Sequence, residues 1–201
     1  MPWLPYSADS NSKAPRLYSA KVLGNQGLRY GELMNALLNA LPSPMRETLF
    51  LRFWSFFKVR TLNFVQPSIE DLNDEEITVS VPLNWRTRNH LNCMYFGVLA
   101  AGADCAGGFL ALHILRKHNT KASIIFKDFK ANFLKRAEGK TYFKCQDGQK
   151  ILDGIAAMEE NGERLNMPVE IVATVPDKTG DEPVATFTLT LSMKPSKNFG
   201  T

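Results

Sequence analysis

One segment limits what this chain can fold into more than any other. Residues 94–115, MYFGVLAAGADCAGGFLALHIL, contain four glycines and a single formally charged side chain, Asp104. The segment is apolar and long enough to cross a bilayer as a helix. Each interior glycine, however, costs a helix roughly 0.5–1 kcal/mol relative to alanine, a cost that close approach of a neighbouring backbone can offset. We therefore predict a helix over about 93–117 that is enclosed by its own protein, without an integral membrane span.

The segments around this helix show the two-residue alternation of strands. Ile77, Val79 and Val81, for example, alternate with polar neighbours. Several strands in succession after the helix favour an antiparallel sheet, with an α+β fold in which five or six strands curl around the helix. The predicted strands are 61–72, 76–83, 122–137, 140–146, 168–176 and 183–194, with a short helix at 149–161.

The first 58 residues form a separate part of the predicted organisation, an arm and helices packed on a main domain at 59–201. Residues 1–30 are rich in Pro, Ser, Asn and Gly and are predicted to be a loosely held arm, and a helix is expected from Gly31 to Leu41. A second helix is expected after Pro44, with a strongly apolar stripe. We interpret this stripe as docked on the main domain, and a membrane-surface helix or a partner site is the alternative. The stripe comprises Leu49, Phe50, Phe53, Trp54 and Phe57.

Composition excludes several classes of function. Lysine plus arginine minus acidic residues gives 24 − 20 = +4, without the basic tracts of a nucleic-acid binder, so no nucleic-acid partner is expected. Three cysteines without a C-x-x-C pair indicate neither a disulfide framework nor a zinc site, and no metal is predicted. The first ten residues, MPWLPYSADS, do not resemble a secretory signal, so a cytoplasmic location is expected.

Asp104 is the most informative single residue. A carboxylate in the middle of a buried helix is unfavourable unless it is hydrogen-bonded or close to water. It is either a structural residue satisfied by a neighbour or a catalytic base or nucleophile that lines a cleft, where partial burial raises its pKa. The residue alone leaves both readings open.

The string N89-H-L-N-C-M-Y-F-G97, followed seven residues later by Asp104, resembles the hotdog-fold acyl-CoA thioesterases of the phenylacetate-pathway type. In that family an Asn-Gly lies six residues before a His-Gly-Gly, and an Asp follows the second Gly by seven. The predicted element order fits the same family, and the resemblance covers roughly residues 60–195. It implies a hotdog fold, in which a curved antiparallel sheet wraps around a long central helix.

The resemblance also implies roles for particular residues. Asn89 matches the family's Asn, which positions water or substrate, and Asp104 matches the catalytic acid. Gly97 matches the second Gly, whose backbone N–H polarises the thioester carbonyl at the helix N-terminus. Tyr95 and Phe96 stand where the family has His and Gly, which makes the predicted substrate pocket tighter and more apolar.

The strand at 122–137 supplies two further candidates for substrate binding. Phe129, Ala131 and Phe133 are expected to face the core. Lys130 and Asn132 alternate with them, and therefore face either solvent or the mouth of a ligand tunnel.

The function implied by the resemblance is hydrolysis of an acyl-CoA-like thioester, with acyl-CoA as substrate and no further cofactor. Because hotdog subunits pair edge to edge with the active site between protomers, a homodimer or homotetramer is expected. Tyr95 and Phe96 favour an alternative, a non-catalytic protein that binds acyl chains or acyl-CoA. A dehydratase of the same fold is a weaker option, for which His90 is the nearby histidine.

Overall fold

The computed structural model describes residues 41–196, so the predicted arm and the helix predicted from Gly31 lie outside the described residues. Six strands form one antiparallel sheet in the order β1-β2-β4-β5-β6-β3. The strands are β1 (Ser68–Leu72), β2 (Ile77–Val81), β3 (Ala122–Phe133), β4 (Thr141–Cys145), β5 (Leu165–Thr174) and β6 (Pro183–Pro195). The helices are α2 (Ser43–Lys58), α3 (Arg60–Val65), α4 (Phe96–Lys117), α5 (Gly148–Asn161) and α6 (Pro176–Thr179).

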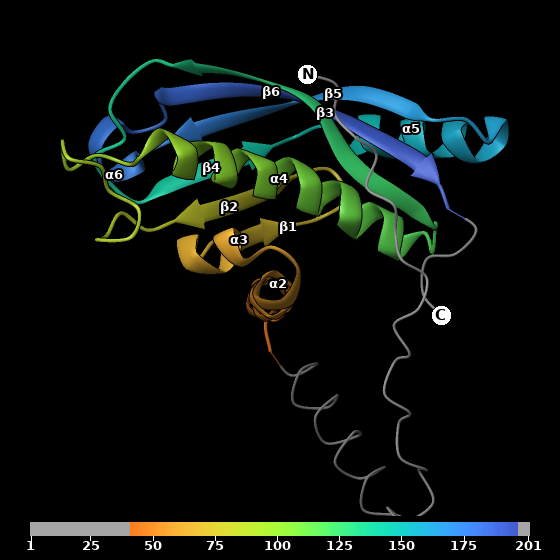
Figure 1. The fold of residues 1–201 in the computed structure, drawn as a ribbon, viewed down its shortest axis with the longest axis horizontal. Helices are drawn as coiled ribbons and strands as arrows, with labels where there is room; N and C mark the ends of the chain where they lie inside the picture. The colour runs from red at the N-terminus through yellow and green to blue at the C-terminus, as the bar shows by residue number, and fades with distance from the viewer. Residues whose placement is uncertain (1–40, 197–201) are drawn as a thin grey trace, which may run out of the picture. The chain divides into compact units, whose positions relative to one another are not determined.

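The sheet curves around α4, as predicted, with β3 and β6 on one side of the helix and β1 and β2 on the other (Figure 1). The strands bury one face against the helix and leave the other exposed. In β5, for example, Met167, Val169, Ile171 and Ala173 are buried and the residues between them are exposed. This alternation places the apolar side of each strand in a core built around α4.

The central helix is enclosed by the domain. Its length and composition would suit a membrane span, but 67% of its most apolar window is buried inside the fold. Small residues allow the sheet to come close: a Cβ atom at Gly102 would lie 2.4 Å from the ring of Phe143, on β4. At Gly107 a Cβ atom would lie 3.3 Å from Val169. The glycines of this helix therefore make room for the sheet, and α4 is a core helix.

The segment at 61–65, predicted as strand, is helical in the structure and forms most of α3. Leu62 and Val65 are buried three residues apart on one side of this helix, and Gln66 ends it in the left-handed conformation (φ 58°). A helix of six residues with three apolar side chains is too short to show a helical period, which explains the wrong prediction. Strand β1 begins only at Ser68.

The α2 helix packs on the domain through only part of the predicted stripe, because Phe50 and Trp54 are partly buried against the core. Leu51 and Ser55 are buried, whereas Leu49, Phe53 and Phe57 of the predicted stripe are exposed. The backbone N–H of Ile69, on β1, donates a hydrogen bond to the Thr48 hydroxyl, with N and O 2.8 Å apart, and joins α2 to the sheet. The docked face is thus narrower and more polar than the apolar stripe suggested.

Among the described strands, β3 lies at one edge of the sheet and pairs with β6 alone. Its register shifts between Phe126 and Phe129, where a bulge interrupts the pairing. The rings of Phe129 and Phe133 contact Phe187 of β6, with centroids 5.7 and 6.2 Å apart, yet 44% and 51% of these two residues are exposed. Their predicted core-facing orientation holds, but the edge position leaves them half uncovered.

Candidate active site

Asp104 lies in the middle of α4 on the side that faces α2, α3 and the beginning of β3, where it borders a cavity of about 470 Å³. Among the described residues, the only other charged side chain on the cavity wall is the exposed Lys58. The remainder is almost entirely apolar: Leu51, Trp54 and Leu62 contribute from α2 and α3, Phe109 and Leu112 from α4, and Ile124 and Phe126 from β3. A single carboxylate therefore faces a space suited to an apolar ligand.

Burial raises the pKa of the Asp104 carboxyl above its ordinary value. Within residues 41–196 the carboxylate has no hydrogen-bond or ion-pair partner that would oppose this effect. The neighbouring Cys105 is buried, and burial together with the charge of Asp104 raises the pKa of its thiol, so that the thiol stays protonated. Asp104, rather than Cys105, is therefore the residue in this cavity that can accept a proton.

Gly97 lies in the first turn of α4, where backbone N–H groups have no partner within the helix and carry partial positive charge. Seven residues separate it from Asp104, so the two lie on the same face of the helix, about 10 Å apart along its axis. The ring of Tyr95 lies over Gly97, because a Cβ atom there would be 2.6 Å from the ring. A side chain at position 97 would therefore displace Tyr95.

Asn89 holds the loop that leads into α4. Its side-chain oxygen accepts hydrogen bonds from the backbone N–H groups of Leu91 and Cys93, at 2.8 and 3.3 Å. Its side-chain nitrogen lies 3.3 Å from the Cys93 sulfur. Asn89 is thus engaged in shaping the loop, and through the loop it sets the position of the first turn of α4.

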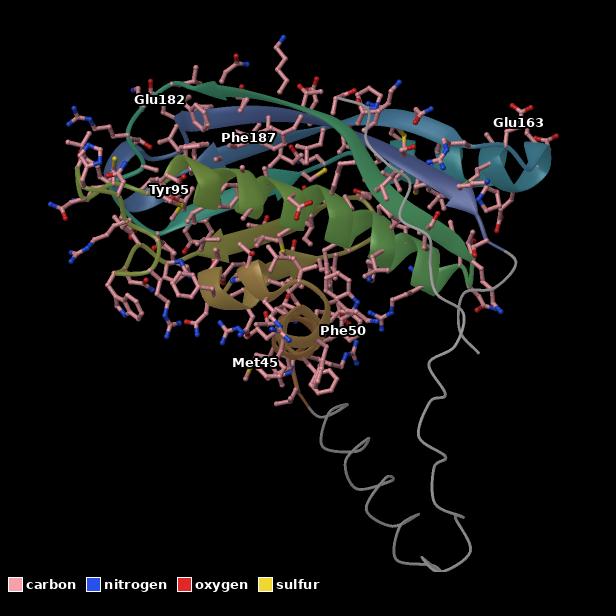
Figure 2. The ribbon with its side chains drawn as sticks, in the orientation of Figure 1. Met45, Phe50, Tyr95, Glu163, Glu182 and Phe187 are labelled. Carbon is pink, nitrogen blue, oxygen red and sulfur yellow. The ribbon has the colours of Figure 1, made fainter. Side chains whose placement is uncertain are left out.

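Tyr95 and Phe96 stand at the beginning of α4, with ring centroids 4.8 Å apart, and Figure 2 shows Tyr95 at this end of the helix. Both residues and Asn89 line a second, more open cavity of about 630 Å³. Phe96 reaches across it towards Phe133 of β3, with a centroid distance of 6.5 Å. Lys135 and Arg136 complete this wall with positive charge.

Lys130 and Asn132 are exposed on β3 and line neither of these two cavities. The Asn132 side-chain nitrogen lies 3.4 Å from the Thr186 hydroxyl of β6. The structure therefore brings Asn89, Tyr95 and Phe96 together at one cavity and places Asp104 in another. Gly97 lies between the two groups along α4, while Lys130 and Asn132 stand apart from both.

Comparison with known proteins gives this arrangement a family. Residues 47–193 match the model of the domain of unknown function DUF4442, which covers well over half of the chain. The chain belongs to the DUF4442 family. No curated protein matches it.

Solved structures resemble this DUF4442 domain over most of its length. A Shewanella oneidensis protein provisionally described as a thioesterase is 18% identical, with a TM-score of 0.63, covering 74% of this chain and 97% of that one. A Pseudomonas aeruginosa protein of unknown function, also provisionally described as a thioesterase, is 22% identical, with a TM-score of 0.62 and coverage of 78% and 97%. A thioesterase from Haemophilus influenzae is 14% identical, with a TM-score of 0.54 and coverage of 74% and 92%. These similarities confirm the predicted hotdog fold.

Sequence reasoning missed the parts of the DUF4442 site that depend on tertiary packing. Leu51, Trp54 and Leu62 form a wall of the Asp104 cavity, although α2 and α3 precede the central helix by some forty residues in the sequence. Lys135 lines the second cavity because the chain turns where β3 ends, and both its N–H and that of Leu134 reach the carbonyl of Val184. No local pattern would have indicated either feature.

The described part of the chain contains no group of three or more His, Cys, Asp or Glu side chains placed to hold a metal ion. Its three cysteines are buried and form no disulfide with one another. The chemistry that the described residues offer is thus that of a carboxylate, backbone N–H groups and an apolar cavity.

Proposed function

We propose that this DUF4442 domain hydrolyses an acyl-CoA-like thioester and that Asp104 is the catalytic base or nucleophile. The observation that carries the proposal is the partly buried Asp104 carboxylate, without a partner among residues 41–196, on the wall of an apolar cavity. Such a cavity suits an acyl chain, and a carboxyl whose pKa is raised towards the working pH suits proton transfer. The thioesterase names of two fold relatives, provisional in one case, point in the same direction.

With Asp104 as general base, the reaction proceeds in two steps. Asp104 takes a proton from a water molecule while the water oxygen attacks the carbonyl carbon of the thioester. The carbon–sulfur bond then breaks, and the proton passes from Asp104 to the sulfur of the leaving thiol. The backbone N–H of Gly97 donates a hydrogen bond to the carbonyl oxygen, where negative charge develops between the two steps.

A second copy of the chain would complete this site. Asp104 and Gly97 of one chain are about 10 Å apart along α4, too far to act on one carbonyl group. Strand β3 is an edge strand with exposed Ile125, Phe129 and Phe133. Edge strands of this kind readily pair. A homodimer formed through β3 would bring Asp104 of one copy towards Gly97 of the other.

The test is release of free thiol from a panel of acyl-CoA substrates of increasing chain length. We expect Asp104→Asn to lower kcat/KM by at least about 100-fold. Asp153→Asn is the matched control, because Asp153 is also a helical aspartate but lies on the surface of α5, where Gln149 donates to it at 2.8 Å. An Asp104→Asn variant as active as the Asp153→Asn variant would refute the mechanism.

A non-catalytic protein that binds acyl chains is the second candidate. The observation that favours it is the ring of Tyr95 over Gly97, which restricts the approach of a thioester to the backbone N–H. The same acyl-CoA panel separates the two candidates: saturable binding, measured by calorimetry, without any thiol release would select the binding function.

A further inference from the structure

The exposed side of α2 is unusually apolar. Met45, Leu49, Phe53, Phe56 and Phe57 form one stripe, here called the aromatic face, with 49–68% of each residue exposed. Met45 points away from the sheet at the free side of α2 (Figure 2). The three phenylalanine rings pack on one another rather than on the domain, with centroid distances of 5.0 and 5.1 Å. Exposed rings in a contiguous group mark an interaction surface.

A second exposed aromatic group lies on α3 and the loop before α4. Phe64 and Trp85 are 51% and 69% exposed, and their rings meet edge to face at 6.1 Å. The Arg86 guanidinium lies over both rings, 5.9 Å from the centroid of Phe64 and 5.1 Å from that of Trp85. Here too the rings contact one another and a cation, and they stay accessible to a partner.

The exposed charged residues of α2 and α3 are all basic. Arg52, Lys58 and Arg60 are exposed on α2 and α3, and Arg86 follows on the loop. The single acidic residue of α2 and α3, Glu47, has its side chain only 11% exposed and lies 3.8 Å from Arg116 of α4. This surface therefore offers apolar rings together with positive charge.

We propose that the aromatic face binds the surface of a lipid bilayer that contains anionic lipids. Bulky apolar rings that insert at the headgroup level, flanked by Arg and Lys, are the physical requirements of a helix that lies in a membrane interface. The aromatic face also lies on the same helix as one wall of the Asp104 cavity. That wall is formed at the C-terminal end of α2 by Trp54, Lys58 and the following Val59. An apolar ligand that arrives from the bilayer would therefore meet the cavity beside the bound helix. Membrane binding is independent of whether Asp104 is catalytic.

The experiment is co-sedimentation of the full-length protein with vesicles of phosphatidylcholine alone or with 30% phosphatidylserine. We expect the wild-type protein to bind the anionic vesicles at least about tenfold more tightly than the neutral ones. Phe53→Ser/Phe57→Ser should lower binding to anionic vesicles by about tenfold or more, because the inserted apolar area is lost. Arg60→Glu/Arg86→Glu should remove the preference for phosphatidylserine.

Two matched controls separate this surface from general stickiness. Leu91→Ser removes an apolar side chain that is 53% exposed nearer to α4 on the loop that carries Trp85 and Arg86, outside the aromatic face, and should bind anionic vesicles like the wild type. Asp104→Asn should do the same, so that a failure of the proposed hydrolysis would leave the membrane result intact. Circular dichroism of each variant checks that the fold is kept.

Three outcomes would overturn the proposal. One is a wild-type protein that stays in the supernatant with anionic vesicles, as it would if residues 1–40 or another protein cover the face. Another is equal binding by the wild type and Phe53→Ser/Phe57→Ser. The third combines two results: the wild type binds no vesicles, and analytical ultracentrifugation gives Phe53→Ser/Phe57→Ser a smaller oligomeric mass than the wild type. That combination would assign the face to contact between two copies of the chain.

Discussion

Two sides of the central helix meet the rest of the domain in different ways. On one side Gly102 is pressed against Phe143, and a Cβ atom there would lie 2.4 Å from the ring. On another side, six residues further on, a Cβ atom at Gly108 would lie 3.4 Å from Phe126, beside the cavity that Asp104 lines. The same residue type thus permits tight packing against the sheet in one place and borders open space in the other. A core helix can in this way serve both as scaffold and as the wall of a cavity.

The largest effect should come from the side of α4 that carries Asp104 and borders the cavity, here called the open side. It is the change of kcat/KM with pH. In the proposed mechanism Asp104 acts as a base only when it is ionised, and burial raises its pKa. We therefore expect kcat/KM for an acyl-CoA to fall about tenfold for each pH unit below a midpoint that lies above the usual aspartate value of about 3.9. Stopped-flow or thiol-release assays between pH 4 and pH 9 measure this limb.

Asp104→Asn serves as the control for this profile, because its residual activity should lack the acidic limb. A midpoint inside the ordinary range for aspartate would mean that the cavity is as well hydrated as the surface. The Asp104 side of α4 would then be exposed to water rather than form part of a partly buried cavity, and the contrast between Gly102 and Gly108 would not describe an interior site.

The side of α4 that lies against the sheet at Gly102, here called the packed side, should lose the most stability when a side chain is enlarged. Gly102→Ala places a methyl group against the buried ring of Phe143, which is 0% exposed. We expect a loss of about 1–3 kcal/mol in the free energy of unfolding, because a full core accommodates an extra methyl group only by strain. Urea denaturation followed by circular dichroism measures the shift in midpoint. An unchanged midpoint would show that Phe143 can move aside, and that the packing is looser than the distances indicate.

The ionised carboxylate of Asp104 should lower the free energy of unfolding. The pKa of Asp104 is raised in the folded protein. At a pH between the unfolded and the folded pKa, the folded state therefore holds a proton that the unfolded state has already released. The wild type is therefore destabilised progressively as the pH rises through the folded pKa. Asp104→Asn should raise the free energy of unfolding by about 0.5–2 kcal/mol at neutral pH and lose this gain below the unfolded pKa. Urea denaturation at pH 3.5 and at pH 7.5 compares the two conditions, and a gain that is equal at both would exclude the charge as its cause.

The sequence predicted those parts of the fold that depend on local pattern. Alternation identified β2 through Ile77, Val79 and Val81, and the long apolar run identified α4. The face of α2 that docks was not predictable, because apolar side chains occur all round this helix. Leu51 packs inward while Leu49 and Phe53, two residues to either side, point outward. Only the tertiary structure decides between such faces.

The candidate site was predictable where one residue contradicts its surroundings. Asp104 stood out as the single charge in the apolar segment 94–115, and the structure places it beside a cavity. The cavity itself arises from the way α2 and α3 dock on α4, which no local pattern encodes. Lys130 and Asn132 are exposed on β3, but the alternation could not show that β3 is an edge strand or that these two side chains line neither cavity.

The smallest expected effect is that of Gly108→Ala, and it is also the sharpest test of the comparison. The new methyl group meets only the end of the Phe126 ring, at an ordinary contact distance of 3.4 Å, beside open space. Alanine favours a helix over glycine by about 0.8–1 kcal/mol, a gain that Gly102→Ala shares. The difference between the two variants in urea denaturation therefore isolates packing from helix propensity. Gly108→Ala should be neutral or stabilised by up to about 1 kcal/mol. If it loses as much stability as Gly102→Ala, the side of α4 that carries Asp104 is as closely packed as the side under the sheet, and has no room for an acyl chain.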